Sequence, residues 1–157
     1  IHIKGSNGSG KSTLLRIILG ITIPTKGKIK KSIEEDISYL GHKNALKSYL
    51  SVEDNIKLMG LLNHHELKKN LETLGLKRKL DIKVANLSYG QQKKLALLRI
   101  FMSNSNLIVL DEPFVGLDIK NQNILSNFLN NQLQNEKGII FTSHISCEID
   151  SKTLKID

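Results

Sequence analysis

The sequence has one cysteine, few arginines, no sustained heptad repeat and no apolar run long enough to cross a membrane. The single cysteine, Cys147, excludes an intramolecular disulfide, and a zinc site there would have only His144 nearby as a second ligand. A membrane helix needs about 20 consecutive apolar residues. Any role at a membrane would therefore require a partner protein.

The formal net charge of +8 does not by itself indicate a nucleic-acid partner. Of the 23 basic residues, 20 are lysines, and they are scattered along the chain instead of clustered. Proteins that read bases rely more on arginine. We therefore expect no nucleic-acid partner.

The length bounds the number of domains. The 157 residues, of which 39% are hydrophobic, can bury one substantial core but are too few for two ordinary domains. We therefore expect a single domain over residues 1–157. The chain begins with Ile1 instead of Met, and a glycine-rich segment already starts at Gly5. We also expect that an N-terminal stretch is missing from the sequence.

Apolar segments of two kinds alternate along the chain. We expect strands at residues 1–4, 37–40, 107–110 and 138–141, and helices around 14–19, 51–62, 65–74, 88–101 and 121–133. Ser51 and Asp54 have the spacing of a capping box, and Gly75 favours a helix end. This alternation predicts the α/β class, with a mostly parallel sheet flanked by helices and ligands at the carboxyl ends of the strands. Residues 44–86 are predicted to form a mostly helical insert.

The glycine-rich segment after the first expected strand matches the phosphate-binding pattern G-x-x-x-x-G-K-[ST] in full. It consists of Gly5, Ser6, Asn7, Gly8, Ser9, Gly10, Lys11 and Ser12. Glycines let backbone N–H groups turn toward phosphate oxygens, and the following helix adds the positive end of its dipole. Lys11 should reach the β and γ phosphates, and Ser12 should supply a hydroxyl ligand for Mg²⁺. The segment predicts a nucleoside triphosphate site.

Two carboxylates follow the apolar strand at 107–110. Asp111 would orient Mg²⁺, and Glu112 is our candidate for the general base or the water-orienting group of hydrolysis. Because acidic residues often end strands, this pair alone could equally be a solvated strand end.

Residues 87–91, Leu-Ser-Tyr-Gly-Gln, resemble the LSGGQ signature of ATP-binding cassette (ABC) proteins. Residues 116–118 resemble the D-loop of that family, and residues 142–144 resemble its switch-histidine segment. The motifs occur in the family's order and span nearly the whole chain. Tyr89 stands where the signature normally has its first glycine, which reduces backbone freedom at that point.

The resemblance implies the P-loop NTPase fold of ABC ATPases, with ATP and Mg²⁺ bound between two cassettes. Each phosphate loop would face the signature of a second subunit, most simply an identical copy, so Ser88, Gly90, Gln91 and Asp118 would contact the partner's nucleotide. His144 would contact the γ phosphate as a second catalytic residue. The resemblance also implies integral membrane transporter subunits as partners, and a peripheral position on the cytoplasmic face of the inner membrane.

Within the family, residues 39–47 and 50–55 are similar to the haem exporter ATP-binding subunits of cytochrome c maturation, as is the run Gln-Gln-Lys-Lys at 91–94. One position departs from the family pattern. Lys43 aligns with a glutamine that usually links Mg²⁺ and the attacking water to the membrane partner, and an ammonium cannot ligate a cation. Either Lys43 contacts a phosphate instead, or metal coordination depends on Ser12 and Asp111 alone.

Three alternatives to a haem exporter ATPase remain at this stage. The chain could serve another ABC exporter or importer, or be an ABC ATPase outside transport. DNA-repair and chromosome-organising cassettes place long coiled coils between phosphate loop and signature, and no sustained heptads occur here. A nucleotide-binding module without hydrolysis would fit the lysine at position 43, but the presence of Glu112 and His144 argues against it.

Overall fold

The expected strands assemble into one sheet in the computed structural model, which describes residues 1–30 and 36–157. In chain order the elements are β1 (His2–Lys4), α1 (Lys11–Ile18), β2 (Ile37–Leu40), α2 (Val52–Leu58), α3 (Leu67–Thr73), the short 3₁₀ turns η1 (Lys77–Lys79) and η2 (Val84–Asn86), α4 (Tyr89–Phe101), β3 (Leu107–Asp111), α5 (Ile119–Gln134), β4 (Gly138–Thr142) and β5 (Thr153–Lys155). The predicted α/β alternation is confirmed.

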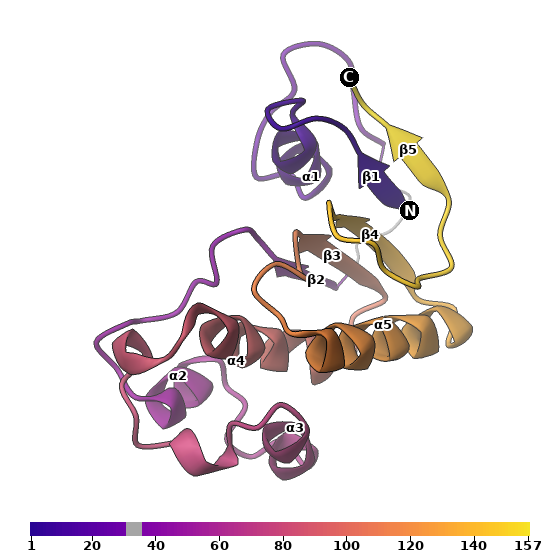
Figure 1. Ribbon diagram of the computed structural model, residues 1–157. Coiled ribbons are helices and arrows are strands. Elements are labelled where there is room, and N and C mark those ends of the chain that lie inside the picture. Colours follow the sequence, from indigo (N-terminus) through magenta and orange to yellow (C-terminus); the bar gives the residue numbers. More distant parts are fainter. Residues whose placement is uncertain (31–35) are drawn as a thin grey trace.

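The sheet has the strand order β2-β3-β4-β1-β5, and every neighbouring pair is parallel (Figure 1). Parallel strands bring their carboxyl ends to one edge. The phosphate loop follows β1 at that edge, and Asp111 at the end of β3 pairs in register with Thr142 at the end of β4. The sheet therefore gathers segments that are more than a hundred residues apart.

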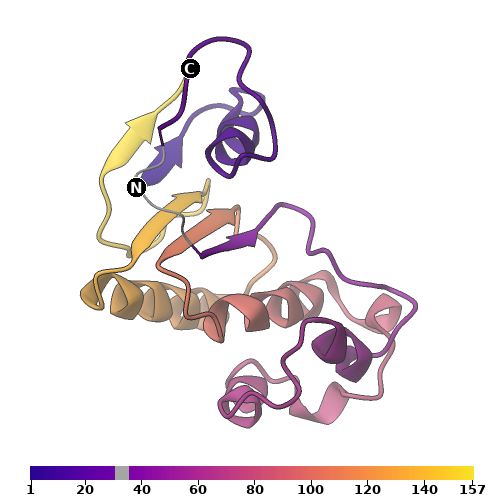
Figure 2. The ribbon, with the colours of Figure 1, turned by 180° about the vertical axis from the view of Figure 1, so that it is seen from behind.

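Helices cover both faces of the sheet, with α1 on one face and α4 and α5 along the other (Figures 1 and 2). The alternation of side chains along β3 matches this arrangement. Val109 packs with Leu15 of α1, whereas Ile108 and Leu110 join the larger core under α4 and α5. This two-sided burial explains why the strand is apolar at every position from 107 to 110.

The helical segment between β2 and α4 extends the larger core. Its buried side chains include Val52, Ile56, Leu74 and Val84, which belong to the same hydrophobic cluster as α4. The capping box expected at the start of α2 is present, because Ser51 Oγ accepts from the Asp54 N–H and the Asp54 carboxylate accepts from the Ser51 N–H. Figure 2 shows α2 and α3 beside α4, on the side away from the sheet.

The first helix of this segment is shorter than predicted. It ends at Leu58, because Gly60 adopts a φ of 72° and the Leu61 N–H donates to the Ile56 carbonyl, which closes the helix in a Schellman motif. Leu62 was expected on this helix but lies beyond it, 40% exposed. The next helix ends before Gly75 in the same way, as predicted.

The short strand β5 was not predicted. Its three residues, Thr-Leu-Lys, are all exposed and form no apolar run, and the strand exists because its backbone pairs with β1. Over residues 1–30 and 36–157, the structure has no helix that is both long enough and apolar enough to span a membrane.

We predict that Leu98→Ala destabilises the protein by about 2–5 kcal/mol, because Leu98 on α4 is fully buried and its loss would leave a cavity in the larger core. Urea unfolding followed by circular dichroism measures the effect. Leu58→Ala is the matched control, since Leu58 is 64% exposed on α2, and a change within about 0.5 kcal/mol is expected. Equal losses in the two variants would contradict this description of the core.

Candidate active site

The phosphate loop leaves β1 and enters α1 through a backbone that only small residues allow. A Cβ on Gly5 would lie 2.2 Å from the Ile156 carbonyl oxygen, so this position has no room for a side chain. Gly8 and Gly10 have φ angles of 86° and 92°, which L-residues rarely adopt. Gly10 is also the N-cap of α1 and offers no side chain to its first-turn N–H groups. Those N–H groups remain available to an anion.

Lys11 lies over this loop and is 8% exposed. Its ammonium donates to the carbonyl oxygens of Gly5 and Ser6, at 2.9 and 2.8 Å. The positive charge is thereby held at the centre of the loop by the backbone itself. Ser6 thus contributes its backbone carbonyl to the Lys11 contact. The hydroxyl of Ser9, in the same loop, is buried.

Asp111 and Glu112 stand at the end of β3, and one threonine of β4 contacts both residues. The Thr142 hydroxyl donates to Asp111 Oδ1 at 2.8 Å and accepts from the Glu112 N–H at 2.9 Å. Asp111 Oδ2 is buried and has no hydrogen-bond partner among the residues that the structure describes. Glu112 has a φ of 50°, an uncommon conformation outside glycine that is typical of functional sites.

His144 contacts Glu112 through its backbone and its ring. Its N–H donates to Glu112 Oε2 at 3.2 Å, and its Nε2 lies 3.4 Å from Glu112 Oε1. The Glu112 side chain is largely buried, whereas the imidazole is about half exposed. Although the Glu112 carboxylate is bonded to His144, Glu112 still lines a cavity.

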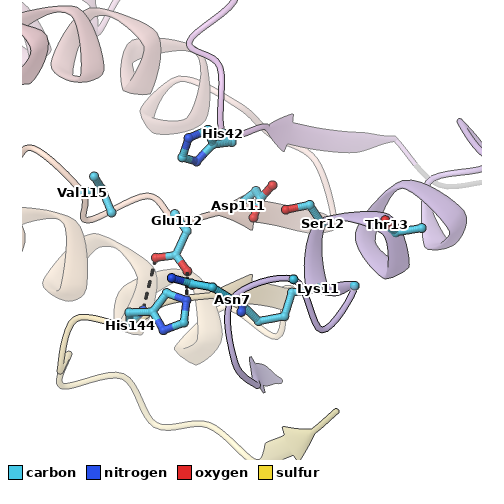
Figure 3. Close-up of a pocket in the computed structure, with 11 residues that line it drawn as sticks. Asn7, Lys11, Ser12, Thr13, His42, Asp111, Glu112, Val115 and His144 are labelled. Carbon is cyan, nitrogen blue, oxygen red and sulfur yellow. Dashed lines mark hydrogen bonds and ion pairs between the residues drawn. The ribbon is translucent and has the colours of Figure 1, made fainter. Parts of the chain in front are cut away.

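These groups surround one cavity of about 400 Å³ (Figure 3). Its lining residues are Asn7, Gly8, Gly10, Lys11, Ser12, Thr13, His42, Asp111, Glu112, Val115 and His144. They come from the ends of β1, β2, β3 and β4, which is where a parallel sheet binds its ligands. Asp111 and Glu112 are buried in the protein, yet both face this cavity.

The structure does not place Lys43 in the cavity wall. Its neighbour His42, two residues after β2, lines the cavity instead. Two side chains hold the loop that carries both residues. The Arg99 guanidinium donates to the Asn44 carbonyl. The buried Asn55 side chain accepts from the Lys47 N–H and donates to the Lys47 carbonyl. Nucleotide contact by Lys43 stays a prediction, and His42 is a further residue of this loop that lines the cavity.

The signature residues form a second cavity of about 250 Å³, with its own set of lining residues. These are Ser88, Gly90, Gln91, Lys94, Gly116, Leu117, Asp118 and Asn121. All four residues that the resemblance assigned to a partner's nucleotide lie here and not with the phosphate loop. The chain thus carries two separate cavities, and each contains part of the predicted nucleotide-binding residues.

Caps and a close glycine contact shape the second cavity. Ser88 and Gln91 form a capping box at the start of α4, and the Asp118 carboxylate caps α5. A Cβ on Gly90 would lie 2.4 Å from the Gly116 carbonyl oxygen. The Tyr89 ring covers the other side of Gly116, so the residue that departs from the signature pattern packs against the loop after Glu112.

A buried lysine of α4 interacts electrostatically with the acidic pair. Lys93 on α4 is 0% exposed, and its ammonium lies 5.9 Å from the centre of the Tyr89 ring. Burial lowers the pKa of Lys93, and the negative charges of Asp111 and Glu112 partly offset this effect. The signature helix therefore places a positive charge behind the acidic pair.

Sequence comparisons agree with this geometry. A profile of the ABC transporter family matches residues 1–115. The chain is similar to the cytochrome c biogenesis ATP-binding export protein CcmA of Histophilus somni, with 35% identity over 92% of this chain and 73% of the relative. It is also similar to the protein of the same name from Bradyrhizobium diazoefficiens, with 34% identity over 99% of this chain and 83% of the relative.

Solved structures give the same result. An ATP binding subunit of an ABC transporter aligns with a TM-score of 0.83 and 25% identity, over 99% of this chain and 73% of that one. The cassette MJ0796, in a dimeric post-hydrolysis state bound to ADP and Pi, aligns with a TM-score of 0.74 and 25% identity, over 92% of this chain and 74% of that one. The predicted fold class is confirmed. The chain belongs to the ABC transporter family and is an ATP-binding, ATP-hydrolysing subunit of such a transporter.

Proposed function

We propose that this subunit drives an exporter of cytochrome c biogenesis by hydrolysing ATP between its own phosphate loop and the signature of a second copy. The observation that carries the proposal is the division into two cavities, one with the phosphate loop and acidic pair, the other with Ser88, Gly90, Gln91 and Asp118. Neither cavity holds both sets of groups, and two chains facing one another would complete two sites. We propose a homodimer for this reason.

In the first cavity, the backbone N–H groups of residues 8–12 bind the β and γ phosphates, together with the Lys11 ammonium. When phosphate is bound, the Lys11 ammonium would contact phosphate oxygens in place of the carbonyl oxygens of Gly5 and Ser6. Asn7 lines the cavity beside them and has an amide suited to a phosphate oxygen. The two remaining loop residues, Gly5 and Ser6, shape the backbone of the loop.

The donors also suit Mg²⁺, which prefers oxygen ligands in octahedral geometry. The Ser12 hydroxyl and the buried Asp111 Oδ2 face the same cavity, and the Asp111 oxygen lacks a hydrogen-bond partner in the described part of the chain. When bound, Mg²⁺ would offset the negative charge that moves during phosphoryl transfer. Ser12 and Asp111 would hold it there.

Glu112 is the group that accepts a proton in hydrolysis. As the water oxygen bonds to the γ phosphorus and the bond to the bridging oxygen of ADP breaks, the Glu112 carboxylate takes a water proton. His144 fixes this carboxylate through its N–H and presents its ring to the γ phosphate. In the second cavity, the N-terminus of α4 would stabilise the γ phosphate of the partner's ATP.

Transport requires partners in the membrane. We propose that residues 44–86 act as a helical subdomain that receives integral membrane subunits, since the exposed apolar side chains Tyr49, Leu58 and Leu62 lie in this segment. The relatives named as cytochrome c biogenesis ATP-binding export proteins support a role in that process. We propose haem export as the transport step. The subunit would then be peripheral, on the cytoplasmic face of the inner membrane.

Replacing Glu112 with Gln should abolish hydrolysis and spare ATP binding. The amide keeps the size of the side chain but cannot accept the proton, so we expect steady-state hydrolysis to fall by about 100-fold or more. Phosphate release measures turnover, and a fluorescent ATP analogue measures the dissociation constant. Glu53→Gln, at an exposed position of α2, is the control and should behave as wild type. Undiminished turnover in Glu112→Gln would remove Glu112 from its assigned role.

Replacing Ser88 with Asp should prevent ATP-dependent dimer formation. Aspartate is as good an N-cap as serine, so α4 keeps its start, but its negative charge repels the partner's γ phosphate. In a Glu112→Gln background with ATP and Mg²⁺, size-exclusion chromatography with light scattering should give a dimer, and adding Ser88→Asp should give a monomer. Ser88→Thr keeps the hydroxyl and should still dimerise. A dimer of unchanged stability with Asp at this position would argue against a signature contact to ATP.

The proposed process can be tested in cells of the source organism that lack this chain. Wild-type protein should restore covalently bound haem in c-type cytochromes, visible as haem staining on denaturing gels, and Glu112→Gln should not. Normal haem staining in the deletion strain itself would assign the subunit to a different ABC transporter.

A further inference from the structure

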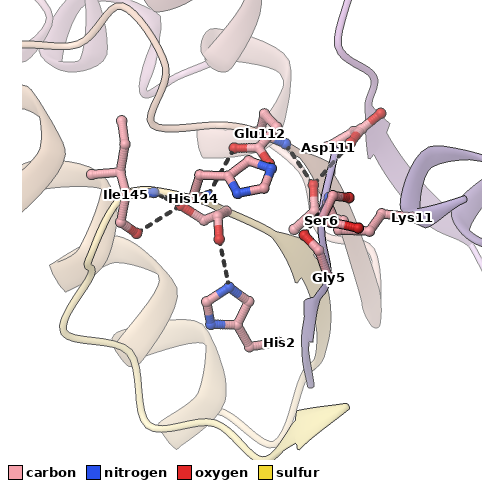
Figure 4. Close-up of polar contacts among 10 residues, drawn as sticks. His2, Gly5, Ser6, Lys11, Asp111, Glu112, His144 and Ile145 are labelled. Carbon is pink, nitrogen blue, oxygen red and sulfur yellow. Dashed lines mark hydrogen bonds and ion pairs between the residues drawn. The ribbon is translucent and has the colours of Figure 1, made fainter. Parts of the chain in front are cut away.

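His2 is a buried residue that lies outside the cavity with the phosphate loop and acidic pair. His2 is 7% exposed on β1, three residues before the phosphate loop. Its ring stacks on Phe141 of β4, with the ring centres 4.3 Å apart and the planes inclined by 22°. This stack directs the edge of the imidazole past the end of β4, where Nε2 lies 3.1 Å from the Ser143 carbonyl oxygen (Figure 4).

The tautomer of His2 follows from this contact. A carbonyl oxygen only accepts hydrogen bonds, so Nε2 carries the proton and donates it. Burial is the main effect on His2 and lowers its pKa, although the bond to Ser143 acts in the opposite direction. The ring is therefore neutral at pH 7.

The Ser143 carbonyl and the His144 N–H belong to one peptide group. On its oxygen side this group accepts from His2, and on its nitrogen side it donates to Glu112 Oε2 at 3.2 Å. A trans peptide is planar, with its C=O and N–H pointing in opposite directions. Fixing the oxygen therefore fixes the direction in which the N–H points.

Two physical effects connect His2 with Glu112 through this peptide. The first is geometric, because rotation of the peptide plane would turn the His144 N–H away from the carboxylate. The second is electronic, because a hydrogen bond to a carbonyl oxygen polarises the amide and makes its N–H a stronger donor. The first effect orients the His144 N–H toward the Glu112 carboxylate, and the second strengthens the hydrogen bond between them.

We propose that His2 is a positioning residue that aims the 143–144 peptide at Glu112 and so holds the carboxylate ready to accept a proton from water. The inference rests on the proposed role of Glu112 in hydrolysis. β1 then has two roles, because it leads into the phosphate loop and its residue His2 holds the peptide before the switch histidine.

Three substitutions in the full-length protein separate positioning from simple packing. His2→Leu fills similar space but removes the donor, and it should lower kcat for ATP hydrolysis about tenfold, the effect of losing one hydrogen bond. KM for ATP should stay within about twofold, because the phosphate contacts are untouched. His2→Gln places an amide N–H near the position of Nε2 and should restore kcat. Phe141→Leu removes the stack and keeps the donor. It should therefore lower Tm, and it should lower kcat less than His2→Leu does.

A double mutant identifies the route of the effect. If His2 acts through Glu112, then His2→Leu should cause no further loss in a Glu112→Gln background, measured as single-turnover hydrolysis. Equal kcat losses in His2→Leu and His2→Gln, or an undiminished tenfold effect in that background, would overturn the inference. Normal hydrolysis by Glu112→Gln alone would instead refute the proposed function. The two failures are therefore distinguishable.

Discussion

The parallel register between β3 and β4 is the constraint on which the site depends. It sets Asp111 opposite Thr142, and one threonine hydroxyl then bonds the Asp111 carboxylate and the Glu112 backbone. A shift by one residue would turn these side chains to the other face of the sheet. β1 pairs with the other edge of β4. The β1–β4 and β3–β4 registers together therefore set the distance between the phosphate loop and the acidic pair.

The electrostatics of the site follow from burial. Asp111 and Glu112 are almost fully enclosed. The groups that act on them include the Thr142 hydroxyl, the His144 N–H and the charge of the buried Lys93. Incompletely paired carboxylate oxygens cost free energy in a buried site. A site that binds a cation and a triphosphate recovers that cost when it is loaded, which accounts for keeping Asp111 Oδ2 without a partner among the described residues.

Contiguous motifs made the phosphate loop, the acidic strand end and the signature predictable, because each lies within a few residues of sequence. The contacts of Thr142 and His2 were not predictable, because each joins neighbouring strands that are distant in the chain. Thr142 and Asp111 are 31 residues apart, and His2 and Ser143 are 141 residues apart. Lys43 was identified because it aligns with a glutamine of the family. A loop has no periodicity that tells which of its side chains face the cavity. His42 was not predicted, and its position two residues after β2, at the edge where ligands bind, was the available signal. Strand β5 had none, because backbone pairing alone forms it.

The central claim is that each ATP lies between the phosphate loop of one chain and the signature of another. Mixing two inactive variants tests it most directly, since a heterodimer of Glu112→Gln with Ser88→Asp contains one site in which both partners are intact. The account predicts that single-turnover hydrolysis, strongly reduced in each variant alone, recovers when the two are mixed. A mixture as inactive as its components, although heterodimers are present, would contradict it.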